Sequence, residues 1–120
     1  MGLDITFNRI KFSKIAYFRK VNFLVKFFED KGLDIEEQKP LLINKNDAEE
    51  LLSKCEEVLK DRSKGPELLP TMEGFFFGST DYDDYYYYSV NETSKFIKNT
   101  LLPLFDELDD DEYITFNIWY

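Results

Sequence analysis

The chain has 120 residues, of which 43% are hydrophobic and 32% are charged, and this composition predicts one folded domain rather than a disordered chain. It contains no histidine and a single cysteine, which excludes an internal disulfide, a cysteine-based metal site and any catalytic device that needs histidine. The formal net charge of -9 disfavours direct binding of nucleic acid, because phosphates repel an acidic surface. With no long apolar run and no secretory signal, we expect a cytoplasmic protein without a membrane partner.

The first third of the chain alternates between strand-like and helix-like patterns. Residues 3–7 alternate apolar and polar side chains, as a half-buried strand does. Residues 15–30 repeat apolar side chains at helical spacing, and Gly32 is a suitable C-terminal stop for that helix. Residues 38–43 predict a short strand, which Pro40 favours at the edge of a sheet.

The clearest predicted helix covers residues 47–62. Asn46 is placed to cap it, and Glu49 follows three residues later, a pattern close to a capping box. The apolar face of this helix includes Cys55, which we therefore expect to pack in the core rather than to react. Residues 63–66 then end the helix and open a loop.

An aromatic-rich stretch follows. Residues 74–80 contain three consecutive phenylalanines and predict a strand that is buried on both faces. Asp81 is placed to cap the next helix, which Pro103 must end or kink near Asn99. The alternative for the start of this helix is a strand over residues 85–90.

The last stretch, residues 113–120, alternates between two faces and predicts a C-terminal strand that is tied into the sheet. The series of elements is then β-α-β-α-β-α-β. It predicts an α+β domain with a small, mostly antiparallel sheet and two to three helices packed on it. The pattern leaves the order of the strands open.

Two acidic segments are candidate binding surfaces. The first 28 residues carry six Lys or Arg against one acid, so the rest of the chain carries nine against 23. Such asymmetry indicates a polar partner surface, and exposed tyrosines beside acids are typical of protein interfaces. The predicted partner-binding residues are Asp81, Asp83, Asp84, Tyr85, Tyr87, Asp106, Glu107, Asp109, Asp110, Asp111 and Glu112.

Other interpretations of these segments stay open. Asp81, Asp83 and Asp84 can cap a helix and complement its dipole, or hold Mg²⁺ or Ca²⁺ with a further oxygen such as that of Asp4. Residues 106–112 are typical of a solvated loop, or they imitate the phosphate spacing of nucleic acid and block a basic groove. No motif predicts a reaction, so we name no catalytic residue, no metal ligand and no cofactor.

Three stretches form a recognisable series: residues 1–5 (MGLDI), 17–22 (YFRKVN) and 68–86 (LLPTMEGFFFGSTDYDDYY). Their order and spacing resemble a family of small, uncharacterised proteins from phages, prophages and bacterial genomes. The chain departs from that family at Phe18, where the family often has tryptophan, and at Val25, where it often has histidine. The family has no established activity, so the resemblance implies context rather than mechanism.

Small acidic phage proteins often act stoichiometrically on host machinery, and inhibitors of CRISPR nucleases belong to that class. By this analogy we expect a non-enzymatic protein that occupies a basic surface of a host protein, for example one that binds nucleic acid. One alternative is a metal-dependent enzyme or metal-stabilised domain that uses Asp81, Asp83 and Asp84. Another is a structural homodimer that pairs a sheet edge near Pro40 or the C-terminal strand.

Overall fold

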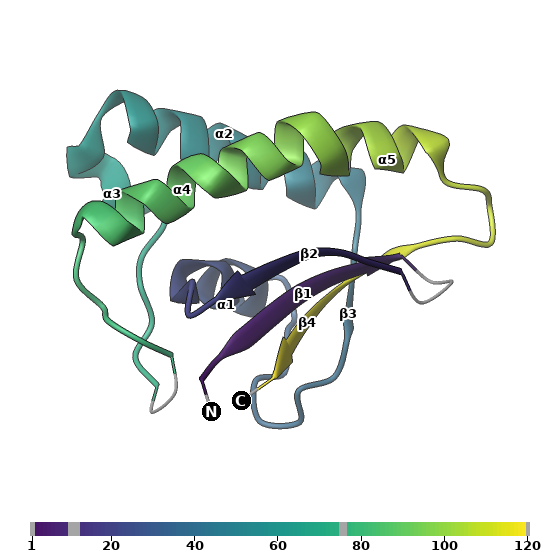
Figure 1. Cartoon of the computed structure of the whole chain (residues 1–120), viewed down its shortest axis with the longest axis horizontal. Coiled ribbons are helices and arrows are strands. Elements are labelled where there is room, and N and C mark those ends of the chain that lie inside the picture. Colours follow the sequence, from purple (N-terminus) through teal and green to yellow (C-terminus); the bar gives the residue numbers. More distant parts are fainter. Residues whose placement is uncertain (1, 10–12, 75–76, 120) are drawn as a thin grey trace.

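In the computed structural model the chain forms an α+β domain with a four-stranded antiparallel sheet (Figure 1). The structure describes residues 2–9, 13–74 and 77–119. The strands are β1 (Asp4–Arg9), β2 (Ser13–Arg19), β3 (Leu41–Ile43) and β4 (Ile114–Trp119), and they lie in the order β2-β1-β4-β3. The predicted fold class and the antiparallel sheet are confirmed, but the predicted count of two to three helices is too low.

The helices are α1 (Asn22–Glu29), α2 (Lys45–Lys60), α3 (Gly65–Leu68), α4 (Asp84–Phe96) and α5 (Leu102–Glu107), with a 3-10 turn η1 (Arg62–Lys64) and a π-helical segment η2 (Ile97–Leu101). The predicted regular alternation of strands and helices is wrong, because two strands come first and several helical segments follow β3. In Figure 1, α2, α4 and α5 lie together along one side of the sheet. None of the described helices combines the length and apolar character that a membrane span requires.

The predicted helix over residues 15–30 is wrong in its first half. Its N-terminal part is β2, which forms a hairpin with β1, and helix α1 begins only at Asn22. Tyr17 lies in β2 and Val21 lies directly before α1, on either side of Lys20, whose left-handed backbone (φ 57°) turns the chain. The side chains of β2 alternate little between polar and apolar, and the strand is followed closely by the apolar helix α1. A helical period therefore fitted the whole stretch, and the strand was not predicted.

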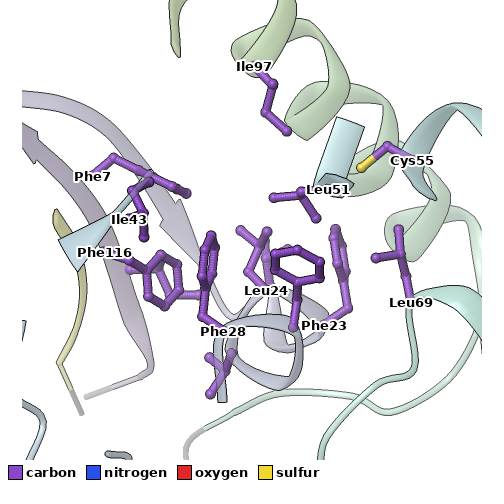
Figure 2. Packing of buried hydrophobic residues seen from close by; sticks show 14 of the residues in the cluster. Phe7, Phe23, Leu24, Phe28, Ile43, Leu51, Cys55, Leu69, Ile97 and Phe116 are labelled. Carbon is purple, nitrogen blue, oxygen red and sulfur yellow. The ribbon is translucent and has the colours of Figure 1, made fainter. Parts of the chain in front are cut away.

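Helix α1 joins the sheet to the outer helices. Six of its eight residues are buried. The ring of Phe28 lies 4.3 Å from that of Phe116 and 6.1 Å from that of Phe7, both in the sheet, measured between ring centroids. Phe23 packs edge-on against Tyr86 of α4 at 5.5 Å, and Figure 2 shows these phenylalanines within the core. Only Lys26 and Glu29 of α1 are partly exposed, and they pair with each other (3.6 Å), so the apolar side chains of this helix pack into the core between the sheet and α4.

The predicted helix over residues 47–62 is confirmed as α2, but its cap is not the predicted one. Asn44 accepts a hydrogen bond from the Asp47 backbone N–H (2.8 Å), and the Asp47 carboxylate accepts one from the Asn44 N–H (3.2 Å). This capping box lies two residues before the predicted pair of Asn46 and Glu49. Cys55 is buried as expected, and burial raises the pKa of its thiol to about 12, so it is not a reactive thiolate at neutral pH.

Three predictions for the middle of the chain need correction. Residues 63–66 do not open a loop, because they continue into the short helical segments η1 and α3. The described part of residues 74–80 contains no strand, although Phe77 is buried; residues 75–76 lie outside the described residues. The alternative strand over residues 85–90 is wrong, because these residues belong to α4.

Pro103 distorts the last helix as expected. It lies at the start of α5, directly after η2, and it has no N–H to donate to the carbonyl of Asn99. The wider π turn accommodates this missing bond, and the helical path continues to Glu107. A single helical path thus runs from α4 through η2 to α5.

The predicted C-terminal strand is confirmed as β4, with Ile114, Phe116 and Ile118 buried; Tyr120 lies outside the described residues. It pairs with β1 along its whole length and with β3 through Ile114, Thr115 and Phe116. The edges of the sheet are β2 and β3, and Pro40 lies directly before the latter, as expected for an edge strand.

Candidate functional site

A cavity of about 460 Å³ lies where the end of β2, the start of α1, the loop after α3 and the first turns of α4 meet. Its lining includes two cations, Arg19 and Lys20, and two carboxylates, Asp81 and Asp83. A volume of this size suits a small molecule or side chains of a partner. Two of the stretches that carry the family resemblance line the cavity, and Gly2 of the third lies against Lys20.

Asn22 holds the loop that forms part of the cavity wall. Its side chain is 3% exposed. Its amide Nδ2 donates to the carbonyl oxygens of Phe77 (3.0 Å) and Ser79 (2.9 Å), and its Oδ1 accepts from the Met72 N–H (3.1 Å). One buried side chain therefore ties both arms of the loop to the first residue of α1.

A second set of hydrogen bonds closes the same loop. The Thr71 hydroxyl donates to the Thr80 carbonyl (2.9 Å), and the Tyr82 hydroxyl accepts from the Thr71 N–H (3.1 Å). The Tyr86 hydroxyl donates to the Leu69 carbonyl (2.7 Å). Burial raises the pKa of Tyr86, so this hydroxyl remains a neutral donor. The sequence pattern missed this function of the threonines and tyrosines, because their partners are backbone groups that only the folded loop brings near.

Lys20 lies at the edge of the cavity in a conformation that is uncommon for a residue with a side chain. Its backbone N–H donates to the Leu3 carbonyl (2.9 Å), and its φ is 57°. A Cβ on Gly2 would lie 2.7 Å from Lys20 Cε, and a Cβ on Gly78 would lie 3.0 Å from Lys20 Cβ. The lysine stem thus packs closely against two residues that have no side chain.

Asp83, rather than the predicted Asp81, caps α4. The Asp83 carboxylate accepts from the Tyr86 N–H (3.0 Å), whereas Asp81 lies in the loop before it, where its own N–H donates to the Ser79 hydroxyl oxygen (3.0 Å). Within the described ranges no three acidic, histidine or cysteine side chains are grouped so that they could hold a metal ion. The metal-dependent alternative therefore has no geometric support.

The four consecutive tyrosines differ in exposure. Tyr85 and Tyr88 are 54% and 59% exposed, and their rings stack at 6.3 Å between centroids with 28° between planes. Tyr86 is buried, and Tyr87 is half-buried with the Arg62 guanidinium 4.5 Å from its ring centroid. The sequence selected Tyr85 and Tyr87 and missed Tyr88. Tyr88 follows Tyr85 by three residues, and residues at this spacing lie on the same face of a helix, so the sequence could have indicated that both rings are exposed together.

Carboxylates flank the stacked pair. Asp81 and Asp84 are exposed, and neither makes an ion pair with another described residue. Glu92 accepts a hydrogen bond from the Tyr88 hydroxyl (3.2 Å), and this negative charge raises the pKa of Tyr88. We call Asp81, Asp84, Tyr85, Tyr88 and Glu92 the acid–tyrosine patch.

The second acidic segment lies at the other end of the long helix (Figure 1). Residues 84–107 form one helical path of about 35 Å at 1.5 Å per residue, in a molecule whose longest extent is 40 Å. Asp106 pairs with Lys45 (2.9 Å), and Glu112 accepts from the Asp109 N–H (3.1 Å). Of the predicted partner-binding residues, the structure brings 81–87 together at one end and 106–112 at the other, so they do not form one patch.

Comparisons with known proteins assign the chain to no family. It matches no family model, and searches of curated proteins and of solved structures find no significant match either. The resemblance to small phage and prophage proteins therefore stays a prediction. Any function must be argued from the cavity and the acid–tyrosine patch.

Proposed function

We propose that the protein is a non-enzymatic binding protein whose acid–tyrosine patch docks on a basic surface of another protein. The observation that supports this is the pair of stacked, half-exposed rings of Tyr85 and Tyr88 beside the exposed carboxylates of Asp81 and Asp84, which make no ion pair with a described residue. Glu92, the third acid of the patch, pairs with Lys95 (3.6 Å). Tyrosine rings pack against the aliphatic part of arginine side chains and stack on their planar guanidinium groups, and carboxylates form ion pairs with the same groups. Aromatic anchors with a charged rim are the usual source of affinity at an interface.

The patch is also held in place before any partner arrives. The Tyr85 hydroxyl donates to the Arg19 carbonyl (3.0 Å), and the Tyr88 hydroxyl donates to Glu92 (3.2 Å). Rings that are already ordered lose less conformational entropy on binding, which favours affinity. The segment 106–112 would act differently, because its carboxylates add long-range attraction to a basic partner and increase the association rate.

The chemistry of the patch fits proteins that expose arginine and lysine for binding nucleic acid. The resemblance to phage and prophage proteins is the reason to test a host defence protein, such as a CRISPR effector, as this partner. The second arrangement worth testing is a homodimer, since β2 and β3 are edge strands of the sheet. Light scattering of the purified protein measures this directly.

The test is capture of partners from the host lysate by the tagged protein, followed by affinity measurement with the purified partner. Tyr88→Ala should weaken binding about tenfold or more, because it removes an anchor whose hydrogen bond among the described residues is to Glu92. A charge reversal at the far end, with Asp109, Asp110 and Asp111 changed to Lys, should mainly slow association and make it less sensitive to salt.

The matched control is Tyr113→Ala, which removes a 43% exposed ring outside the patch. Equal affinity of wild type and Tyr88→Ala for a partner that the wild type binds would exclude the patch as the docking surface. Release of the partner only by detergent, and not by salt, would contradict its electrostatic character.

A further inference from the structure

The backbone of Lys20 is the first indication that the cavity has a ligand of its own. With φ at 57°, residue 20 occupies a region where glycine is comfortable and a side chain is disfavoured. A glycine here would give the same turn between β2 and α1 without that strain. Residues in a strained backbone conformation are found where their side chain is needed at a site. The strain at residue 20 therefore indicates that the side chain of Lys20 has a function.

The surroundings of Lys20 are adapted to its stem. Gly2 and Gly78 both lack the Cβ that would lie at or within 3.0 Å of the lysine. Gly78 itself has φ at 85°, so the loop approaches Lys20 with a backbone that also favours glycine. Segments far apart in the sequence therefore combine to orient one ammonium group at the edge of the cavity.

The charge of that ammonium group is not neutralised by the described chain. Ten other Lys and Arg side chains are described in contacts to acids or rings, but neither Lys20 nor Arg19 has an ion pair in the described part of the structure. Both line the cavity. Two adjacent cations that make no ion pair with a described residue can hold an anionic group of a ligand at this 460 Å³ cavity, although Asp81 and Asp83 also line it.

The rest of the lining defines the other parts of the ligand. Val21 and Phe23 supply apolar surface, and the half-exposed ring of Tyr85 lies at the same cavity. Asp81 is an exposed carboxylate that can accept from a hydroxyl or amino group. The lining thus offers places for an anion, a flat or apolar body and a hydrogen-bond donor.

We propose that this cavity binds a small molecule or a chain end in which a phosphate or carboxylate is held by Lys20 and Arg19 while an attached ring packs beside Tyr85. The anion is the shared chemistry of the two ligand sources. The cavity shares Asp81 and Tyr85 with the acid–tyrosine patch, but this inference rests on Lys20 and Arg19 rather than on the docking of a basic protein, so failure of one proposal does not decide the other.

The experiment compares probes that differ only in the anion. Isothermal titration of the full chain uses adenosine 5′-monophosphate against adenosine, and glycyl-phenylalanine against its C-terminal amide. We expect at least one anionic probe to bind about tenfold or more tightly than its neutral counterpart, the effect of one or two charge-assisted hydrogen bonds. Which pair shows the preference distinguishes a phosphate ligand from a carboxylate ligand.

The decisive variant is Lys20→Met, which keeps an unbranched stem between Gly2 and Gly78 and removes the ammonium group. It should retain the wild-type melting temperature and lose the preference for the anionic probe. Lys60→Met, at the exposed end of α2, is the matched control and should bind as the wild type does. If Lys20→Met does not fold, Arg19→Gln replaces it, since no described hydrogen bond involves the Arg19 side chain.

Two results would overturn the proposal. The first is the absence of any preference for the anion in both probe pairs with the wild-type protein. The second is an unchanged preference after loss of the Lys20 or Arg19 charge in a variant that melts as the wild type does. Backbone amide chemical shifts of residues 20–23 and 78–81 during the titration locate a bound probe at this cavity rather than elsewhere.

Discussion

The two ends of the long helix carry similar side chains but differ in how the chain holds them. At the start of α4, Asp83 caps the helix, Tyr86 bonds to Leu69 and Asn22 ties down the facing loop. At the end of α5, Asp110 and Asp111 are exposed in a loop whose described hydrogen bonds join Asp109 and Glu112. Both ends are rich in acidic residues. At the start of α4, however, hydrogen bonds among the described residues fix the side chains around a cavity.

The acids on α2 form a third environment, which explains where the net charge remains. Glu50 pairs with Lys31 (2.7 Å), Glu57 with Lys64 (3.2 Å) and Glu56 with Lys98 (3.4 Å). The Lys31 ammonium holds the pKa of Glu50 below its ordinary value. Such exposed pairs add little stability, but they cancel charge locally. Asp81 and Asp84 at one end of the long helix, and Asp110 and Asp111 at the other, make no such pair with a described residue.

The largest expected effect comes from removing the side chain that ties down the loop. Asn22→Ala leaves two carbonyl groups and one N–H of the loop without their partner, and we expect a loss of about 2–4 kcal/mol in the free energy of unfolding. Urea unfolding measures it. The control, Asn46→Ala in the exposed first turn of α2, should change stability by less than about 0.5 kcal/mol. Equal losses of stability in the two variants would mean that the hydrogen bonds of Asn22 do not hold the loop more firmly than an exposed helix position is held.

A smaller effect separates the two aspartates before α4. Asp83→Ala removes the helix cap and should cost about 1 kcal/mol, whereas Asp81→Ala removes a carboxylate that caps nothing and should cost less than about 0.5 kcal/mol. Thermal unfolding of the two variants side by side gives the comparison. A reversed order would show that Asp81 caps the helix in solution, as the sequence pattern first indicated.

The smallest effect is expected at the far end. Changing Asp109, Asp110 and Asp111 to Asn removes three exposed charges and should alter the free energy of unfolding by no more than about 0.5 kcal/mol, with a slight gain from reduced repulsion. Chemical denaturation at low and high salt measures the change in the free energy of unfolding and the part of it that comes from charge repulsion. A large loss of stability would mean that this loop is held by contacts comparable to those around Asn22.

The sequence predicted elements best where one strong period continued for several turns or residues. Helix α2 and strand β4 were found because their apolar positions repeat without interruption. The hairpin of β1 and β2 was missed because residues 15–18 of β2 are four consecutive apolar residues without alternation, and the strand leads through the left-handed Lys20 into an apolar helix. The cap of α4 was displaced by two residues because several aspartates in a row fit the same capping pattern.

The sequence predicted which types of residue form the candidate site, but not how they are arranged in space. The sequence pointed to aromatic and acidic residues after position 80, and the structure confirms that Tyr85 is exposed there. It did not indicate that Lys20, from the β2–α1 turn, lies at the same cavity as Asp81, because residues 61 positions apart meet only in the fold. Nor did it show that the two acidic segments lie at opposite ends of one helix.

The sequence by itself determined the α+β class, the absence of histidine chemistry, the buried thiol of Cys55 and the presence of exposed tyrosine beside acid. These follow from composition and local period, which act over a few residues. The tertiary structure decided the strand order, the binding of the loop by Asn22 and the convergence of Lys20, Asp81 and Tyr85 at a cavity. Such features depend on the packing of apolar surfaces from distant segments, and no local pattern encodes which segments will meet.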